Sequence, residues 1–129
     1  MTTRYEWTLL RAGRFLLDGG GMFGVIPKAV WSRTVTPDDK NRIELHHNCL
    51  LLKGGGRTIL IEAGTGDKLD PKMSNIFGLD GTTVESAITD TGTDPNDVSL
   101  VVVSHLHFDH AGGLTRRARG SEPPHWVAQ

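Results

Sequence analysis

The chain has 129 residues, of which 37% are hydrophobic and 22% are charged, and it contains 16 glycines. This length fits one domain spanning residues 1–129, and the composition is typical of a globular, turn-rich protein rather than a disordered or fibrous one. The formal net charge of -1 excludes a strong general attraction for nucleic acids or anionic membranes, and the single cysteine excludes an intrachain disulfide framework.

The N-terminal residues lack the apolar segment of a signal peptide, and no stretch approaches the roughly 18 consecutive apolar residues of a membrane helix. We therefore expect a cytoplasmic protein with neither a membrane nor a nucleic acid as partner. Cys49 is expected to be a buried small hydrophobe and not a nucleophile.

The first expected element is a strand over residues 7–17, interrupted at Gly13. The glycine-rich segment 18–21 follows and predicts a flexible turn, because glycines adopt turn conformations easily and lose much entropy when ordered. A loop that approaches a ligand closely is the alternative for this segment.

The next segment, residues 22–31, is apolar but contains Gly24 and Pro27. These two residues break helices, so the segment is not expected to form a long one. Phe23 and Trp31 are expected in the core, and the alternative is that they form the wall of a pocket.

A β-hairpin is predicted next, with strands over residues 43–52 and 58–63 joined by a glycine-rich turn at 53–57. His46 and His47 lie on the first strand. Because adjacent strand residues point to opposite faces, both cannot bind one metal from a regular strand, and they are expected to be structural or exposed.

A helix is predicted over residues 83–91, with the capping-box pattern at 82–85 and Gly92 as the residue that follows its end. Its apolar stripe consists of Val84, Ala87 and Ile88. A strand over residues 99–104 follows. Its run of aliphatic residues has no polar alternation, so it is expected to be buried on both faces.

Three of the six histidines fall directly after this strand, in a segment with the pattern H-x-H-x-D-H. His105 and His107 are two residues apart, so in an extended chain they point the same way and can reach one cation. Asp109 and His110 come as the chain turns, and they suit a second cation beside the first. The segment therefore predicts a metal site at the end of the strand.

Neighbouring residues fit this prediction. Gly112 and Gly113 are expected where the backbone passes close to the site, because they remove side-chain bulk there. Leu106 and Phe108 are expected to anchor the loop in the core. A Ser104- or Cys49-based nucleophilic triad is the competing chemistry, but the chain has no G-x-S-x-G elbow.

The segment 105–110 resembles the signature of the metallo-β-lactamase-fold hydrolase superfamily. The hairpin ending at residues 59–64 is also similar, although this chain has Glu62-Ala63-Gly64 where the family usually has Asp-Thr-Gly. The segment 18–31 resembles the bacterial branch that includes lactonases and organophosphate hydrolases.

This resemblance implies an α/β fold, the metallo-β-lactamase-type αββα sandwich, of which the chain is expected to be the N-terminal half. It implies Zn2+, two ions per complete site or other transition metals, and hydrolysis by a metal-bound hydroxide. His105 and His107 correspond to the first metal site, and Asp109 and His110 to the second. Asp109 is also the candidate for handling a proton in the reaction.

The resemblance also implies further ligands downstream, namely a third histidine for the first metal, a bridging aspartate, and a later histidine for the second metal. After His110 the sequence contains only His125, which we assign to a following strand rather than to the metal. A half-sandwich leaves one apolar sheet face uncovered, so we expect self-association through that face.

The leading functional hypothesis is a metal-dependent hydrolase acting on a small-molecule lactone, ester, β-lactam or phosphoester. The first alternative is a truncated, non-catalytic metal-binding remnant that lacks the downstream ligands. The second is a nuclease of the same fold, for which the basic run 116–119 is the only support, and a solvated loop is the simpler interpretation of that run.

Overall fold

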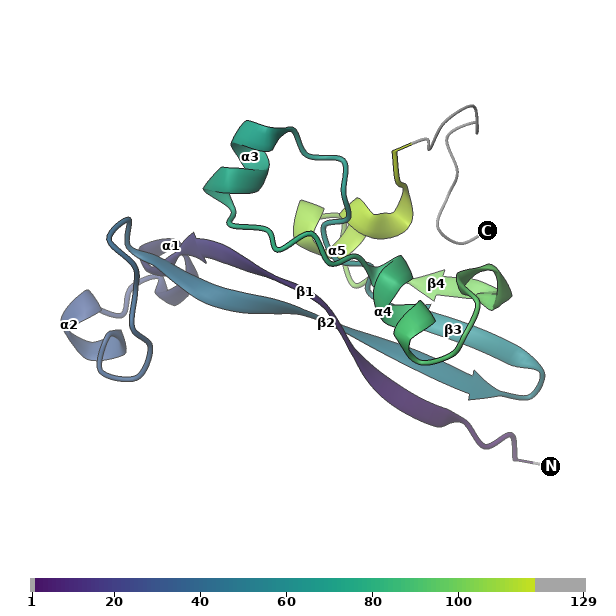
Figure 1. The fold of residues 1–129 in the computed structure, drawn as a ribbon. Coiled ribbons are helices and arrows are strands. Elements are labelled where there is room, and N and C mark those ends of the chain that lie inside the picture. The colour runs from purple at the N-terminus through teal and green to yellow at the C-terminus, as the bar shows by residue number, and fades with distance from the viewer. Residues whose placement is uncertain (1, 118–129) are drawn as a thin grey trace.

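The computed structural model describes residues 2–117, and within them the chain forms one four-stranded mixed sheet in the order β1-β2-β3-β4 (Figure 1). The strands are β1 (Glu6–Asp18), β2 (Arg42–Gly54), β3 (Arg57–Ile61) and β4 (Leu100–Val102). β1 pairs with β2 and β2 with β3 in antiparallel fashion, whereas β3 and β4 are parallel. The crossover that this parallel pair requires contains two helices.

The helices in the described part are short, and none of them is long and apolar enough to cross a membrane. They are α1 (Gly19–Phe23), α2 (Lys28–Trp31), α3 (Pro71–Ile76), α4 (Val84–Asp90) and α5 (Phe108–Ala111), with 3₁₀ turns η1 (Pro95–Asp97) and η2 (Gly112–Leu114). Figure 1 shows α1 and α2 at one end of the long β1–β2 ribbon, away from the strands β3 and β4.

The first strand is confirmed as β1, and its interruption is a β-bulge between Arg11 and Arg14. Gly13 lies in this bulge with φ 105°, a conformation that side-chain-bearing residues rarely adopt. Beyond the bulge, the free edge of β1 is partly paired. The backbone N–H of Arg14 donates to Asp80 Oδ2 at 3.0 Å, and that of Leu16 donates to the carbonyl of Phe77 at 2.7 Å.

The glycine run is not the turn expected from its composition but the helical turn α1. The Asp18 carboxylate caps this turn by accepting a hydrogen bond from the Gly21 N–H at 2.7 Å, which holds the backbone in place without side chains. Gly19 lies against the Trp31 ring, where a Cβ would collide with the indole. Trp31 is buried as expected and stacks on the half-buried Phe23, with ring centroids 4.9 Å apart.

The hairpin is confirmed as β2 and β3, although β3 ends at Ile61, two residues earlier than predicted. His46 is exposed and His47 is buried, as the alternation along the strand requires.

The crossover helix is confirmed as α4, but its N-cap is one residue later than the capping-box pattern indicated. Thr83 and Ser86 form the reciprocal capping hydrogen bonds, so Ser86 takes the place expected for Glu85. Gly92 follows the C-cap with φ 77°, as predicted for that position.

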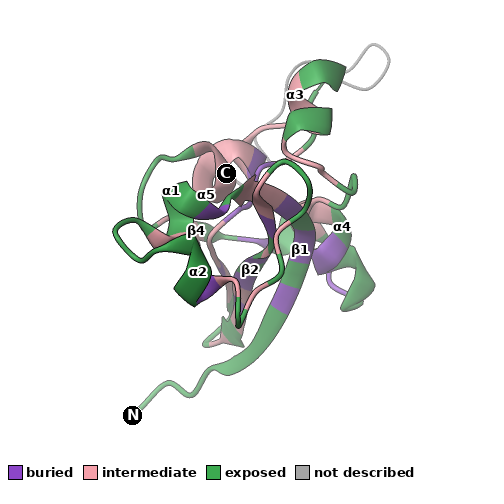
Figure 2. Ribbon diagram, turned by 90° about the vertical axis from the view of Figure 1, so that its left-hand side faces the viewer, coloured by how far each residue is buried: buried purple, intermediate pink, exposed green. Residues whose placement is uncertain are grey.

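One face of the sheet packs against α4 and forms the core, visible as the buried positions in Figure 2. The core cluster comprises Leu10, Ala12, Cys49, Leu51, Leu60, Ala63, Val84, Ala87, Ile88 and Val98. The predicted apolar stripe of α4 supplies three of these residues, and the remainder come from the strands and adjoining loops.

The expectation that the last strand is buried on both faces is wrong. In β4, Leu100 and Val102 are 44% and 45% exposed, and only Val101 packs against the core. Burial on both faces needs a layer on each side of the sheet, and within the described residues only one side has such a layer. The uncovered apolar face that the half-sandwich implies is therefore present.

Replacing a core leucine should destabilise the chain far more than replacing an exposed one in the same sheet. Leu60 is 1% exposed, and Leu60→Ala is expected to lower the free energy of unfolding by about 2–5 kcal/mol. Leu9, 50% exposed, is the matched control, and Leu9→Ala should cost less than about 1 kcal/mol. Denaturant titration followed by circular dichroism measures both. Equal losses would contradict the assignment of the core face.

Candidate functional site

The candidate site lies where β3 and β4 end side by side. The Glu62 N–H donates to the Val102 carbonyl at 2.9 Å, and the Ala63 N–H donates to the His110 carbonyl at 2.9 Å. Because parallel strands present their carboxyl ends at one edge of the sheet, these bonds hold the loop after β4 against the residues that follow β3. They place the H-x-H-x-D-H segment on a rigid support.

The glycine pair has the role predicted for it. The Gly113 N–H donates to the Gly64 carbonyl at 2.8 Å. A Cβ on Gly112 would collide with the Thr65 carbonyl oxygen, and a Cβ on Gly113 with the Ala63 carbonyl oxygen. Two backbone segments can therefore pass each other here only without side chains.

His105 and His107 converge, as their spacing predicts. His105 Nε2 lies 3.0 Å from His107 Nδ1, and the two rings meet edge to face with centroids 4.6 Å apart. Ser104 Oγ lies 2.9 Å from His105 Nδ1, a hydrogen bond that leaves Nε2 as the atom facing His107. Two donors on one tetrahedral zinc at about 2.0–2.1 Å would lie ~3.4 Å apart, so this pair is close to a ligand pair.

Asp109 and His110 form a second pair of donor atoms. Asp109 lies in the first turn of α5, and its Oδ2 is 3.4 Å from His110 Nε2. The other ring nitrogen, Nδ1, is 2.9 Å from Glu62 Oε2. The structure thus brings all four predicted residues to one place, in two pairs.

Glu62 has no role predicted from the sequence, and the structure shows it to be the support of this cluster. Its Oε1 accepts the Ser104 N–H at 2.8 Å while Oε2 binds His110 Nδ1. Burial alone would raise the pKa of Glu62, but the hydrogen bonds from Ser104 and His110 outweigh it and lower that pKa. An ionised Glu62 fixes the tautomer that leaves His110 Nε2 free to bind a metal. The departure from Asp-Thr-Gly was the only sequence signal at this position.

Imidazole and carboxylate groups are donors that zinc and related transition metals accept, so the chemistry of the set fits such a metal. However, within residues 2–117 no group of three or more His, Cys, Asp or Glu side chains is arranged to hold a metal ion. Each pair lacks a third protein ligand there. His125 lies outside the described residues, and the ligand assignments stay predictions.

An open pocket of about 230 Å³ lies beside the second pair and is lined by Asp109 and His110 together with Glu62 and residues of β2. One of these is Cys49, which is 1% exposed. Burial, together with the charge of Glu62, raises the pKa of the Cys49 thiol to about 12. The prediction that Cys49 is not a nucleophile is consistent with this, because the thiolate is the reactive form.

The expected anchoring of the loop is half right. Phe108 is half-buried and packs on Phe77, with ring centroids 4.6 Å apart. Leu106 is 81% exposed, so it does not enter the core. It lies on the loop before α5, where no described element covers it.

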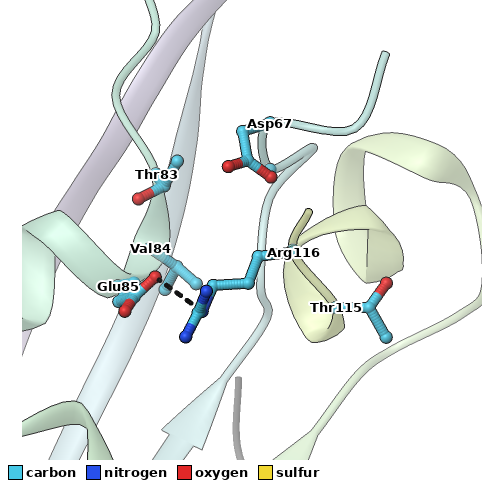
Figure 3. A pocket seen from close by; sticks show the side chains of 8 residues that line it. Asp67, Thr83, Val84, Glu85, Thr115 and Arg116 are labelled. Atoms are coloured by element: carbon cyan, nitrogen blue, oxygen red, sulfur yellow. Dashed lines mark ion pairs between the residues drawn. The ribbon is translucent and has the colours of Figure 1, made fainter. Parts of the chain in front are cut away.

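The basic run after η2 is not a freely solvated loop over the residues that are described. Arg116 Nε lies 3.7 Å from Glu85 Oε2 across a pocket of only 10 Å³, too small for a substrate (Figure 3). Arg117 Nη2 donates to the carbonyls of Lys68 and Leu69 at 2.9 and 3.2 Å. Both arginines thus tie this segment to neighbouring elements.

The profile of the Metallo-beta-lactamase superfamily matches residues 42–129. The chain belongs to the metallo-β-lactamase superfamily. The resemblance drawn from the H-x-H-x-D-H segment and the hairpin is therefore confirmed. Among curated proteins, none matches the chain.

Solved structures of this superfamily resemble the chain. A probable metal-dependent hydrolase from Staphylococcus aureus is 33% identical with a TM-score of 0.80, and the match covers 88% of this chain and 42% of that one. A quorum-quenching N-acyl homoserine lactone lactonase is 28% identical with a TM-score of 0.55, covering 88% and 42%. AidC, a dizinc quorum-quenching lactonase, is 22% identical with a TM-score of 0.63, covering 88% and 37%, and supports the fold alone.

The chain thus spans less than half the length of these structures. Its single sheet with α4 on one face corresponds to one helix layer and one sheet of the αββα sandwich, as expected for the N-terminal half. The second sheet and second helix layer of this superfamily fold have no counterpart in residues 2–117.

His47 lines the same pocket and is buried, and the effect of this burial on its protonation can be tested. Its Nε2 is 2.9 Å from Thr65 Oγ1, and its ring stacks on Phe15 at 4.2 Å. Burial lowers the pKa of His47 from 6.5, although the nearby charge of Asp109 partly opposes the change. Below pH 6.5 the unfolded chain therefore binds the proton more readily than the folded one, and stability falls as the pH falls.

We expect the free energy of unfolding to drop between pH 7.5 and pH 5 by a smaller amount in His47→Gln than in the wild type. Denaturant titrations at both pH values measure this. His46→Gln is the matched control, because His46 is the adjacent histidine and is exposed rather than buried. Identical pH dependence in the wild type and His47→Gln would show that His47 titrates freely in the folded chain.

Proposed function

We propose that this chain supplies the metal-binding portion of a metal-dependent hydrolase that opens lactones. The observation that carries the proposal is the pairing of donor atoms at the end of β4, His105 Nε2 with His107 Nδ1 and His110 Nε2 with Asp109 Oδ2, beside an open pocket. Membership of the superfamily supports a hydrolase in general, and the lactonases among similar structures support the substrate class.

The four residues would hold zinc or a similar divalent metal in two positions. Bound there, the metal lowers the pKa of a water ligand toward 7 and polarises the bond to be broken. Asp109 is a carboxylate at the pocket wall, with Oδ2 3.4 Å from His110 Nε2, and it would accept the proton released when water attacks a lactone carbonyl. Glu62 and Ser104 orient the histidines.

A metal-binding protein without turnover is the second candidate. It is favoured by the lack of a third ligand for either pair within residues 2–117. A cation with too few protein ligands binds weakly and exchanges with solvent. Measuring metal content and hydrolysis together separates the two candidates, because this one predicts bound metal and no product.

The proposed activity is tested with the purified chain loaded with Zn2+, by the acid released when an N-acyl homoserine lactone opens. A phosphotriester, a simple ester and a β-lactam are the comparison substrates. We expect lactone opening above the metal-free background. Metal binding with no hydrolysis of any of the four would contradict the proposal and support the non-catalytic candidate.

Removing one donor of the first pair should reduce metal binding. We expect His107→Ala to weaken Zn2+ affinity more than tenfold, since the pair then becomes a single ligand. His46→Ala, which removes an exposed histidine from β2, should not. Isothermal titration and elemental analysis after desalting measure both. Equal metal stoichiometry in the two variants would contradict the ligand assignment.

We expect Glu62 to affect metal affinity by orienting His110 and not by binding the metal itself. Glu62→Gln keeps the shape but loses the charge that fixes His110, so we expect Zn2+ affinity to fall about 10–100-fold. Glu44→Gln is the matched control, an exposed glutamate on β2. Thermal unfolding checks that both variants fold. Unchanged affinity in a folded Glu62→Gln would remove the supporting role.

A further inference from the structure

The chain leaves β3 through an irregular segment, residues 62–66, which we call the connecting segment. Glu62, Gly64 and Gly66 have φ values of 67°, 67° and 73°, so every second residue lies in the left-handed region. The middle of the segment is nevertheless buried. It has no ladder of regular hydrogen bonds, and its position therefore depends on individual contacts.

On one side, the connecting segment is bonded to β4 and to the elements that carry the donor residues. Backbone hydrogen bonds of 2.8–2.9 Å join it to Val102, His110 and Gly113. Gly112 also lies directly against the Thr65 carbonyl. A shift of the connecting segment would therefore move α5, which carries the second donor pair.

On the other side, one hydrogen bond joins the connecting segment to β2. The ladder between β2 and β3 ends at the pair Leu50–Ile61, and beyond it the pocket of about 230 Å³ is lined by both segments. Here His47 Nε2 lies 2.9 Å from Thr65 Oγ1. Within residues 2–117 no other hydrogen bond links β2 to the connecting segment.

This bond lies in the interior of the chain. His47 is 6% exposed and Thr65 is 4% exposed, and the His47 ring stacks on Phe15 with an angle of 6° between the planes. Its other nitrogen, Nδ1, is buried with no hydrogen-bond partner in the described part of the chain. The stack and the bond to Thr65 thus fix the ring. Losing a buried bond of this kind is costly, because the remaining partner is left unsatisfied.

We propose that His47 and Thr65 are positioning residues for the metal-binding loop, an inference that rests on the proposed function. Their hydrogen bond fixes the connecting segment against β2, and the segment in turn holds Asp109 and His110 at the pocket. Neither residue is a metal ligand in this proposal. Without the bond all four donor residues remain, but their arrangement is less well fixed and the metal binds more weakly.

The first test uses two substitutions at one position. Thr65→Val removes the hydroxyl while keeping nearly the same shape, and Thr65→Ser keeps the hydroxyl. We expect Zn2+ affinity to fall about tenfold in Thr65→Val, the lower end for an outer-shell partner, and to stay within about twofold of the wild type in Thr65→Ser. Thermal unfolding checks that both variants fold. Wild-type affinity in Thr65→Val, or an equal loss in both variants, overturns the proposal.

A double variant tests whether the two residues act together. His47→Phe keeps a ring that can stack on Phe15 but removes the nitrogen that faces Thr65. Because both substitutions break the same bond, the His47→Phe/Thr65→Val chain should bind Zn2+ no more weakly than the weaker single variant. Losses that add up would mean that the two residues act independently, and would overturn the proposed pairing.

The third measurement needs no metal. Amide hydrogen exchange by NMR should be roughly fivefold faster in Thr65→Val at Ala63 and Gly113, whose N–H groups bond the connecting segment to the loop. Ala87, whose N–H donates to the Thr83 carbonyl within the core helix α4, is the control and should not change. Unchanged exchange at Ala63 and Gly113, or an equal increase at all three, overturns the proposal. A wild-type chain that binds no Zn2+ overturns the proposed function instead, and the exchange rates then decide the positioning role.

Discussion

The joint between the end of β3 and the loop after β4 is the contact on which the candidate site depends. Glu62 bridges it with both carboxylate oxygens, one on the Ser104 N–H and the other on His110 Nδ1. It does so from φ 67°, a left-handed conformation that costs a non-glycine residue about 1–2 kcal/mol. Hydrogen bonds to a charged group of roughly 1.5–3 kcal/mol each offset that cost. The conformation persists because the charge is satisfied on both sides.

The two faces of the sheet are both apolar, but one is buried and the other is exposed. The face toward α4 is closed by Val84, Ala87 and Ile88, which bury Leu10, Leu51 and Leu60 almost completely. The face opposite α4 has residues of the same kind, such as Leu9, Leu100 and Val102, but no layer over it among residues 2–117. Burying apolar surface contributes about 25 cal/mol per Å². Covering this second face would therefore stabilise the chain further, whereas the face toward α4 is already buried.

Features set by local periodicity could be predicted from the sequence, and features set by distant contacts could not. The opposite orientation of His46 and His47 and the convergence of His105 and His107 follow from the two-residue period of an extended chain. The supporting role of Glu62 could not be predicted, because its partner His110 is 48 residues away. The aliphatic run of β4 suggests burial on both faces, but whether a second layer covers it is not encoded in the strand itself. Thr82 and Thr83 are adjacent, so the sequence allowed either to be the N-cap of α4. The reciprocal hydrogen bonds between Ser86 and Thr83 make Thr83 the N-cap.

The uncovered sheet face and the H-x-H-x-D-H segment are neighbours in the chain, since His105 follows Val102 by three residues. The loops that follow two parallel strands lie at the same edge of the sheet. The donor residues in the loop after β4 therefore lie at the edge of the sheet and not over its face. His105 and His107 are exposed at this edge. Asp109 and His110 instead line a pocket, because residues of β2 form its opposite wall. The pair beside β2 is thus already partly enclosed by this chain. His105 and His107 lie in solvent at that edge, because no described element covers them.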